Sequence, residues 1–564
     1  MLPLSISNAI TSTFLLLLGS TSLLTSYFSL PAVGQSSQNR ATDPLERVNQ
    51  QVEQLNQQID QIRGGFTTKS ELETVRQRQL EMNQTLRQLA DLLLRQNRIV
   101  EAQQVVDFLK VQELDNYFRK VQKPEPLPTP TEPKVEVVEK YHSLQQSAIQ
   151  LGRELTALRQ IPDRNRTPQQ QQRIRQLVAI EEDLNKQFNE FIRSVDVAKL
   201  LQQINQMSKN QNVKLEDFNA LRDDLRRLNA VLFYPLVLDD RLELIITTPD
   251  SAPLRRTVKV RRQELIATIV AFRRALQDST RLTEAKARGQ VLYNWLIKPL
   301  EPDFKQANTQ TIIYAPDGPL RYIPLAALYD GQQWLVQRFR TNNITAKSLT
   351  QFSRRSQSKL RILAGAFVQG TYEVALGNRQ VIYAGLPFAS KEVTDLAALM
   401  PGTTKLVDGA FNLAAVKAHM NEYNILHFAT HAVFMPGEPE NSFILFGNGD
   451  RATLRDIENW SLQNVDFVVL SACETGVGGQ LGNGEEILGL GYQFQNRGAT
   501  ATIATLWAVK DDSTSILMSS FYASLSKGIN KVEALQQAQI KLITHPNYRH
   551  PLHWAPFILI GNGM

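Results

Sequence analysis

Cysteine is nearly absent from this sequence: the 564 residues contain one, Cys473. A single cysteine excludes any internal disulfide, so packing and hydrogen bonds alone stabilise the fold. It also excludes a zinc site built from cysteine pairs, and we expect neither a metal nor another cofactor. The scarcity raises the question of why this thiol stands at the end of an apolar run, in "NVDFVVLSACETGVGG" (464–479).

Strong net charge and several common catalytic motifs are also missing. The net charge of +7 is small for this length and spread along the chain, so we expect no nucleic-acid partner. No GxSxG sequence is present, which disfavours a serine hydrolase of the α/β type. The glycines of 478–484 follow an apolar run but lack the spacing and the lysine of a phosphate-binding loop.

The first 39 residues contain no charged side chain. Residues 9–30 are mostly apolar, and Ala32-Val33-Gly34 supplies small residues at the spacing that a signal peptidase needs. We therefore expect residues 1–34 to be a signal peptide that exports the protein to the periplasm or the outside of the cell. The alternative is an uncleaved membrane anchor, because about 20 such residues can cross a bilayer.

Residues 35–122 predict an all-α, coiled-coil or helical region. Apolar residues recur at spacings of three and four from Leu45 to Ile62 and from Leu72 to Leu93, which is a heptad pattern. A coiled coil would allow self-association or binding of a protein partner, whereas a helix packed on the rest of the chain fits the pattern equally well. The segment 101–121 continues as a helix.

Proline occupies nearly every second position of residues 123–134, which predicts an extended linker. Residues 135–228 predict a second helical region. Residues 229–564 are the last region: β-rich runs begin near Ala230, and from Lys359 onward apolar runs alternate with amphipathic segments. This alternation predicts an α/β domain with a mostly parallel sheet flanked by helices. The predicted strands include 311–315, 360–366, 381–386, 425–429, 467–470, 502–506 and 557–560; the predicted helices include 391–399, 412–420, 485–496 and 513–526.

Two of the predicted strands lead to residues capable of nucleophilic chemistry. One reads "NILHFATHAVF" and leads to His431, and the other ends at Cys473. In sheets of this kind, sites form at the C-terminal ends of strands. A free thiol is mostly protonated at neutral pH, so a neighbouring imidazole must accept its proton to create the nucleophile. The alternative is that Cys473 is only a small buried hydrophobic residue.

His427 precedes His431 by four residues, a spacing that places both on one strand face if the strand runs that far. His427 lies among apolar residues in mid-strand, so we predict a hydrogen-bonded core histidine there. His431 stands where the strand should open, which is where a general base is needed. Backbone N–H groups around Cys473 could then stabilise the oxyanion of a reacting carbonyl.

Several of these segments resemble one known family, the CHAT domain, a branch of the caspase-like cysteine peptidases related to separase. The segments are "HFATHAVF", "DFVVLSACETG", "GEEILGLGYQFQNRGATATIATLWAVKDDST", "HWAPFILIG" and, in the N-terminal part, "YAPDGPLRYIPLAAL". The resemblance covers 229–561 and implies a catalytic dyad of His431 and Cys473. It implies an oxyanion hole made by the backbone N–H groups of Ala432 and Cys473. It also implies a caspase-like fold in which a degenerate half, 230–349, supports an active half, 359–561.

The segment "TLWAVKDDST" carries a prediction about the substrate. In separases a similar segment is followed by an acidic residue that receives a substrate arginine, and Asp511 matches that position, with Asp512 beside it. Both residues are equally well placed to cap the helix predicted from Ser513. The resemblance therefore implies a protein or peptide substrate cleaved after Arg or Lys.

Two functions follow from these observations. The first is a cysteine endopeptidase of the caspase and separase type, regulated by a partner that binds its helical region. The second is a non-catalytic interaction or scaffold protein that combines a coiled coil with a caspase-like domain.

Overall fold

The computed structural model describes residues 83–84, 86–88, 90–91, 93–95, 99–118, 154, 158, 161, 165–177, 179–180, 216–251, 253–347, 350, 352, 359–376, 379–434, 442–475, 484–509 and 511–564. The predicted signal peptide or anchor (1–34), the first heptad segment and the proline-rich linker (123–134) lie outside these residues. The chain divides into two compact units.

The first unit comprises Met1–Gln112, Arg119–Arg226 and Thr247–Arg255. It contains most of α8 (Glu216–Arg227) and the larger part of α4 (Ile99–Phe118), which overlaps the helix predicted at 101–121; residues 119–121 lie outside the described residues. Within the unit, Thr247 Oγ1 donates to Gln103 Oε1 on α4 at 2.9 Å. The last residues of the same helix, Glu113–Phe118, belong to the second unit.

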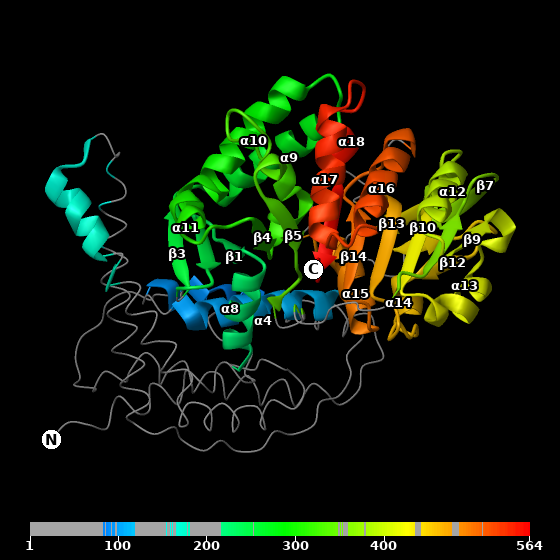
Figure 1. The fold of residues 1–564 in the computed structure, drawn as a ribbon, viewed down its shortest axis with the longest axis horizontal. Coiled ribbons are helices and arrows are strands. Elements are labelled where there is room, and N and C mark those ends of the chain that lie inside the picture. The colour runs from blue at the N-terminus through cyan, green and yellow to red at the C-terminus, as the bar shows by residue number, and fades with distance from the viewer. Residues whose placement is uncertain are drawn as a thin grey trace, which may run out of the picture. The chain divides into compact units, whose positions relative to one another are not determined.

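A mostly parallel sheet is the centre of the second unit, and 13 described strands contribute to it (Figure 1). The strands are β1 (Ala230–Val237), β2 (Leu242–Thr247), β3 (Leu254–Val258), β4 (Thr311–Tyr314), β5 (Arg340–Asn343), β6 (Ile362–Ala366), β9 (Thr403–Val407), β10 (Ile425–Phe434), β11 (Phe443–Leu445), β12 (Arg451–Thr453), β13 (Phe467–Thr475), β14 (Ala501–Thr505) and β15 (Phe557–Gly561). Their order is β12-β11-β10-β13-β14-β15-β5-β4-β1-β2-β3, with β6 and β9 added beside β10.

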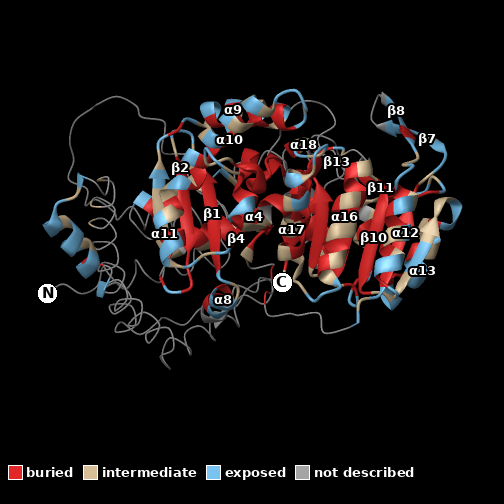
Figure 2. Cartoon of the chain, turned by 45° about the horizontal axis from the view of Figure 1, so that its top comes forward, coloured by how far each residue is buried: buried red, intermediate tan, exposed pale blue. Residues whose placement is uncertain are grey.

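Helices cover the sheet. They are α9 (Arg262–Leu276), α10 (Leu282–Leu296), α11 (Glu301–Gln306), α12 (Ala389–Leu399), α13 (Leu413–His419), α14 (Leu454–Ile457), α15 (Glu485–Asn496), α16 (Asp511–Leu525), α17 (Lys531–Thr544) and α18 (Pro551–Trp554). Helix α16 packs against both α12 and α17, and the three lie over the buried strands in Figure 2. Strands β6, β14 and β15 are buried along their whole length, as expected for strands covered on both faces.

The predicted fold class, a mostly parallel α/β sheet flanked by helices, is confirmed. Helix α15 has the predicted bounds, 485–496, and the helix predicted from Ser513 begins two residues earlier, at Asp511. One strand was placed wrongly: residues 381–386 were predicted among the strands of the main sheet. They overlap β8 (Arg379–Ala384), which forms a separate antiparallel hairpin with β7 (Thr371–Leu376).

Candidate functional site

The site predicted from the sequence lies on β10 and β13, which run parallel to each other. Strand β10 extends from Ile425 to Phe434 and therefore includes both His427 and His431. His427 is aligned with Val469 of β13, and His431 with Ala472. Between the two histidines, β10 advances by four residues while β13 advances by three, so β10 contains one extra residue, a β-bulge.

The bulge overturns one prediction, that His427 and His431 share a strand face. Because side chains alternate along a strand, one extra residue sends every later side chain to the opposite face. The contacts agree with this reversal. His427 meets helices α12 and α16, whereas His431 meets the β7–β8 hairpin.

His431 is held by the end of the hairpin. Its Nε2 lies 2.8 Å from the carbonyl oxygen of Ala384, the last residue of β8. A carbonyl can only accept, so Nε2 carries the proton, and in the neutral ring Nδ1 then keeps a free lone pair. The ring also contacts Tyr383, with the ring centroids 5.2 Å apart, and Phe367, at 6.0 Å.

The hairpin that carries Ala384 is itself fixed by packing. Its inner face joins a buried cluster with β10 and β11, made of Phe367, Val374, Tyr383, Val433, Phe443 and Leu445. Gly385 follows Ala384 in a space with no room for a side chain, because an added Cβ would lie 2.3 Å from the carbonyl oxygen of Val368. The residues on either side of Ala384 are therefore closely packed, and no sequence motif signalled this acceptor for His431.

Cys473 lies on β13, one register position beyond the residue aligned with His431. Its own partner in the ladder is Ala432, so the backbone positions predicted for the oxyanion hole are direct neighbours. Ala432 also pairs with Ile444 of β11 on its other side. The β10–β13 pairing continues to Phe434 and Thr475, which places Cys473 inside a strand and not in a turn after it.

Asp511 and Asp512 are the first two residues of α16. Both oxygens of the Asp512 carboxylate have donors: Oδ1 accepts from the N–H of Ser513 at 2.7 Å, and Oδ2 accepts from the hydroxyl of Tyr548 at 2.8 Å. This hydrogen bond to Asp512 raises the pKa of Tyr548. The Tyr548 ring stacks on His545 with the ring centroids 4.6 Å apart. Tyr548 is thus an orienting partner that the sequence did not indicate.

His427 is a core histidine, as predicted, and its two partners are now visible. Its Nε2 lies 2.9 Å from Glu392 Oε1 on α12, and its Nδ1 lies 3.0 Å from the hydroxyl of Tyr522 on α16. The side chains of His427 and Glu392 are 0% and 2% exposed. Burial, followed by the neighbouring Glu392 carboxylate, raises the pKa of Tyr522 well above its usual value. The phenol therefore keeps its proton, and the group joins two helices to β10.

In the part of the chain described, no cluster of three or more His, Cys, Asp or Glu side chains could hold a metal ion. Nor does any helix there have the length and apolar character needed to span a membrane.

Residues 286–562 match the family model of the CHAT domain. Tetratricopeptide repeat protein 28 of Homo sapiens is 24% identical over 330 residues, which cover 49% of this chain and 13% of the human protein. The Mus musculus protein of the same name is 23% identical over 330 residues, which again cover 49% of this chain and 13% of the mouse protein. The match thus spans only about an eighth of the length of these curated relatives.

Among solved structures, the separase–securin complex of Saccharomyces cerevisiae aligns with a TM-score of 0.39 and 10% identity, covering 86% of this chain and 37% of that one. The Arg-specific cysteine proteinase gingipain R aligns with a TM-score of 0.31 and 7% identity, covering 53% of this chain and 74% of that one.

Proposed function

We propose that this CHAT domain is a cysteine endopeptidase with His431 and Cys473 as its dyad. The observation that carries the proposal is the 2.8 Å hydrogen bond from His431 Nε2 to the Ala384 carbonyl, which orients an imidazole on the strand that pairs with the strand of Cys473. That bond fixes the tautomer in which Nδ1 is the base. A thiol is activated by this kind of oriented imidazole.

The proposed reaction uses each of these groups once. Nδ1 of His431 accepts the thiol proton of Cys473, and the sulfur attacks the peptide carbonyl carbon. The backbone N–H groups of Ala432 and Cys473 stabilise the resulting oxyanion. His431 then returns the proton to the leaving amine, and water hydrolyses the thioester that remains.

A thiol-reactive peptide acyloxymethyl ketone tests the proposal, because only an activated cysteine displaces its leaving group. We expect covalent labelling at Cys473 that requires His431. Absence of labelling under every activating condition would favour the second function, a scaffold protein. That function is supported by relatives whose name refers to tetratricopeptide repeats.

We further propose that Asp511 and Asp512 make the substrate preference basic, with Asp511 as the arginine-binding carboxylate. Asp512 already accepts from Ser513 and Tyr548, so its role is to orient the start of α16. A carboxylate pairs with guanidinium through two hydrogen bonds, which favours Arg over Lys.

Replacing Asp511 by asparagine is therefore expected to reduce cleavage after Arg, relative to Gln, by about 10- to 150-fold, the range for a hydrogen bond to a charged group. Profiling a peptide library by kcat/KM measures this preference. Asp395→Asn on the exposed face of α12 is the control. Cleavage after Asp, or an Arg preference unchanged in both Asp511→Asn and Asp512→Asn, would leave these residues as parts of a helix terminus only.

Export remains our proposal for the location of the protein, with the chain starting near Gln35 or tethered by residues 1–34. N-terminal sequencing of protein isolated from its native host should find Gln35 or a neighbouring residue first, or else the intact segment in the membrane fraction. Intact Met1 on soluble cytoplasmic protein would contradict both forms of the proposal.

A further inference from the structure

A buried arginine in the degenerate half contacts the segment that follows Cys473. Arg321 lies on the short 3₁₀-helix η4 (Gly318–Tyr322), and its side chain is 0% exposed. Its guanidinium forms an ion pair with the carboxylate of Glu113, which is 2% exposed and lies near the end of α4. Charged side chains are rarely buried to this degree unless paired.

The aliphatic part of Arg321 covers Gly484. Gly484 caps the N-terminus of α15 with a φ of 71°, a conformation that favours glycine. A Cβ added there would lie 2.6 Å from Cβ of Arg321 and 3.3 Å from its Cδ. Along the chain, Gly484 is the first described residue after Thr475, the end of the strand that carries Cys473.

A second arginine holds η4 to the active half. Arg273 of α9 donates to the carbonyl of Tyr322, the residue after Arg321, at 3.1 Å. Its other terminal nitrogen donates to the carbonyl of Leu506 at 2.9 Å. Leu506 directly follows β14, in the segment that leads to Asp511. The segment at Gly484 therefore contacts η4 directly, and Arg273 of α9 bridges the segment at Leu506 to η4.

We propose that Arg321 is a positioning residue for Cys473, and that Glu113 makes this positioning depend on α4. The inference rests on the proposed nucleophile and adds a route by which the helical region controls it. Helix α4 runs from Ile99 to Phe118 and includes Glu113. Displacement of Glu113 would leave the guanidinium of Arg321 buried without this carboxylate. Arg321 would then shift, and Gly484 would lose its packing contact with the Arg321 side chain.

Because Cys473 is the only cysteine, a small alkylating reagent reports its reactivity in the intact chain without requiring peptidase activity. Glu113→Gln removes the charge and keeps the shape of the side chain. We expect the rate of alkylation by iodoacetamide, measured well below the unfolding midpoint, to rise at least about fivefold, the lower limit of typical coupling between sites.

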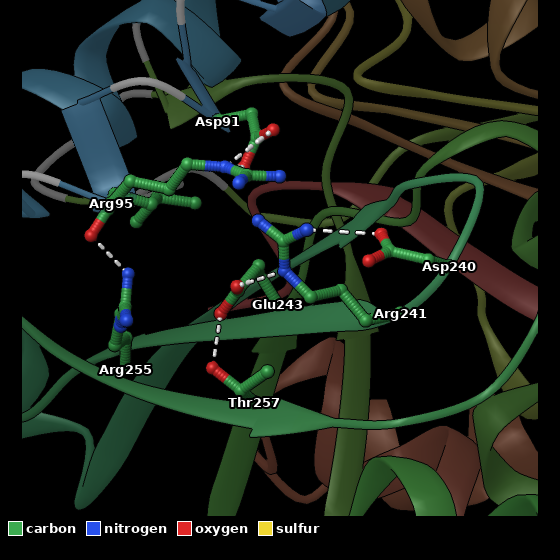
Figure 3. Close-up of polar contacts among 8 residues, drawn as sticks. Asp91, Arg95, Asp240, Arg241, Glu243, Arg255 and Thr257 are labelled. Carbon is green, nitrogen blue, oxygen red and sulfur yellow. Dashed lines mark hydrogen bonds and ion pairs between the residues drawn. The ribbon is translucent and has the colours of Figure 1, made fainter.

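The matched control is another buried carboxylate paired with arginine. Glu243 on β2 is 1% exposed and accepts from Arg241 at 2.7 Å and from Thr257 at 2.7 Å (Figure 3). In the sheet, β2 is separated from β15 by β1, β4 and β5. Glu243→Gln should lower the unfolding midpoint as Glu113→Gln does, yet leave the alkylation rate unchanged.

Gly484→Ala disturbs the contact between Gly484 and Arg321 without changing any residue of α4. It replaces Glu113→Gln as the test variant if Glu113→Gln does not fold. It should also raise the alkylation rate. In the double variant Glu113→Gln/Gly484→Ala, the rise in rate should be smaller than the product of the two single rises, because both changes disturb the same contact. An unchanged or lower rate in both variants, or an equal rise in Glu243→Gln, overturns the proposal. Failure of the peptide ketone to label the parent protein would instead count against the endopeptidase function.

Discussion

Replacing Cys473 by alanine is expected to abolish peptide hydrolysis and covalent labelling, because no other thiol in the chain can form the thioester. Stability should change by no more than about 1–2 kcal/mol, as for most single substitutions. His431→Ala should lower kcat by about 10²- to 10⁴-fold, the usual contribution of a general base. Hydrolysis of a fluorogenic peptide and urea denaturation measure the two effects separately.

His419 supplies the control for the loss of an imidazole. It lies on α13 with its side chain 54% exposed, and its ring contacts Glu422, which is also exposed. His419→Ala should therefore leave both hydrolysis and stability unchanged. If the Cys473→Ala protein cleaves everything that the parent cleaves, the dyad assignment is wrong, whatever the His431 variants do.

The second large effect is expected on stability. Glu392→Ala should lower the free energy of unfolding by about 1–3 kcal/mol, the usual cost of leaving a buried polar group without its partner. The reason is that Glu392 meets His427 at 2.9 Å where both side chains are almost inaccessible to water. Urea denaturation gives this value directly, and the slope of the transition shows whether unfolding stays two-state.

Lys391 and Asp395 provide a matched pair on the same helix. Their side chains are 62% and 33% exposed, so Asp395→Ala should cost no more than about 0.5 kcal/mol. The double variant Glu392→Ala/His427→Ala should lose less than the two single losses together, because each single change already removes the shared contact. Additive losses would mean that the two side chains contribute independently.

The strands and helices could be predicted because their apolar periodicity is strong. The buried runs of β6, β14 and β15 and the bounds of α15 are readable from the sequence alone. The β7–β8 hairpin was placed wrongly because a short apolar run does not show which sheet it joins. Exposure along this hairpin alternates from residue to residue, which is typical of a local antiparallel pair and not of a strand buried on both faces.

The site was predicted less completely than the fold. Strand ends and the family resemblance led to the prediction of His431 and Cys473 as the dyad, which stays a prediction. One inserted residue in β10 decides the face on which each histidine lies, and no residue type indicates a bulge. Glu392 could have been found. It shares the buried stripe of α12 with Ala389, Val393 and Leu396, and an acid at such a position needs a buried partner.

Backbone hydrogen-bond acceptors and ion pairs between residues far apart in the chain could not be predicted from the sequence. The Ala384 carbonyl carries no sequence signal, since every residue has one. The pairing of Arg321 with Glu113 joins residues far apart in the chain and depends on the packing of α4, which local patterns do not determine.

Strand β15 sets the order in which the sheet can be completed. It pairs with β14 from Ala501↔Gly561 to Thr505↔Phe557, and with β5 through Ile560↔Asn343. Asn342 also donates to the Gly561 carbonyl at 2.9 Å. Every other strand of the sheet precedes β15 in the sequence, so during synthesis on the ribosome the edges of β14 and β5 stay open until β15 is made. The two halves close into one sheet only at that last step. Until then β14, the neighbour of the proposed nucleophile strand β13, keeps an open edge on the nascent chain.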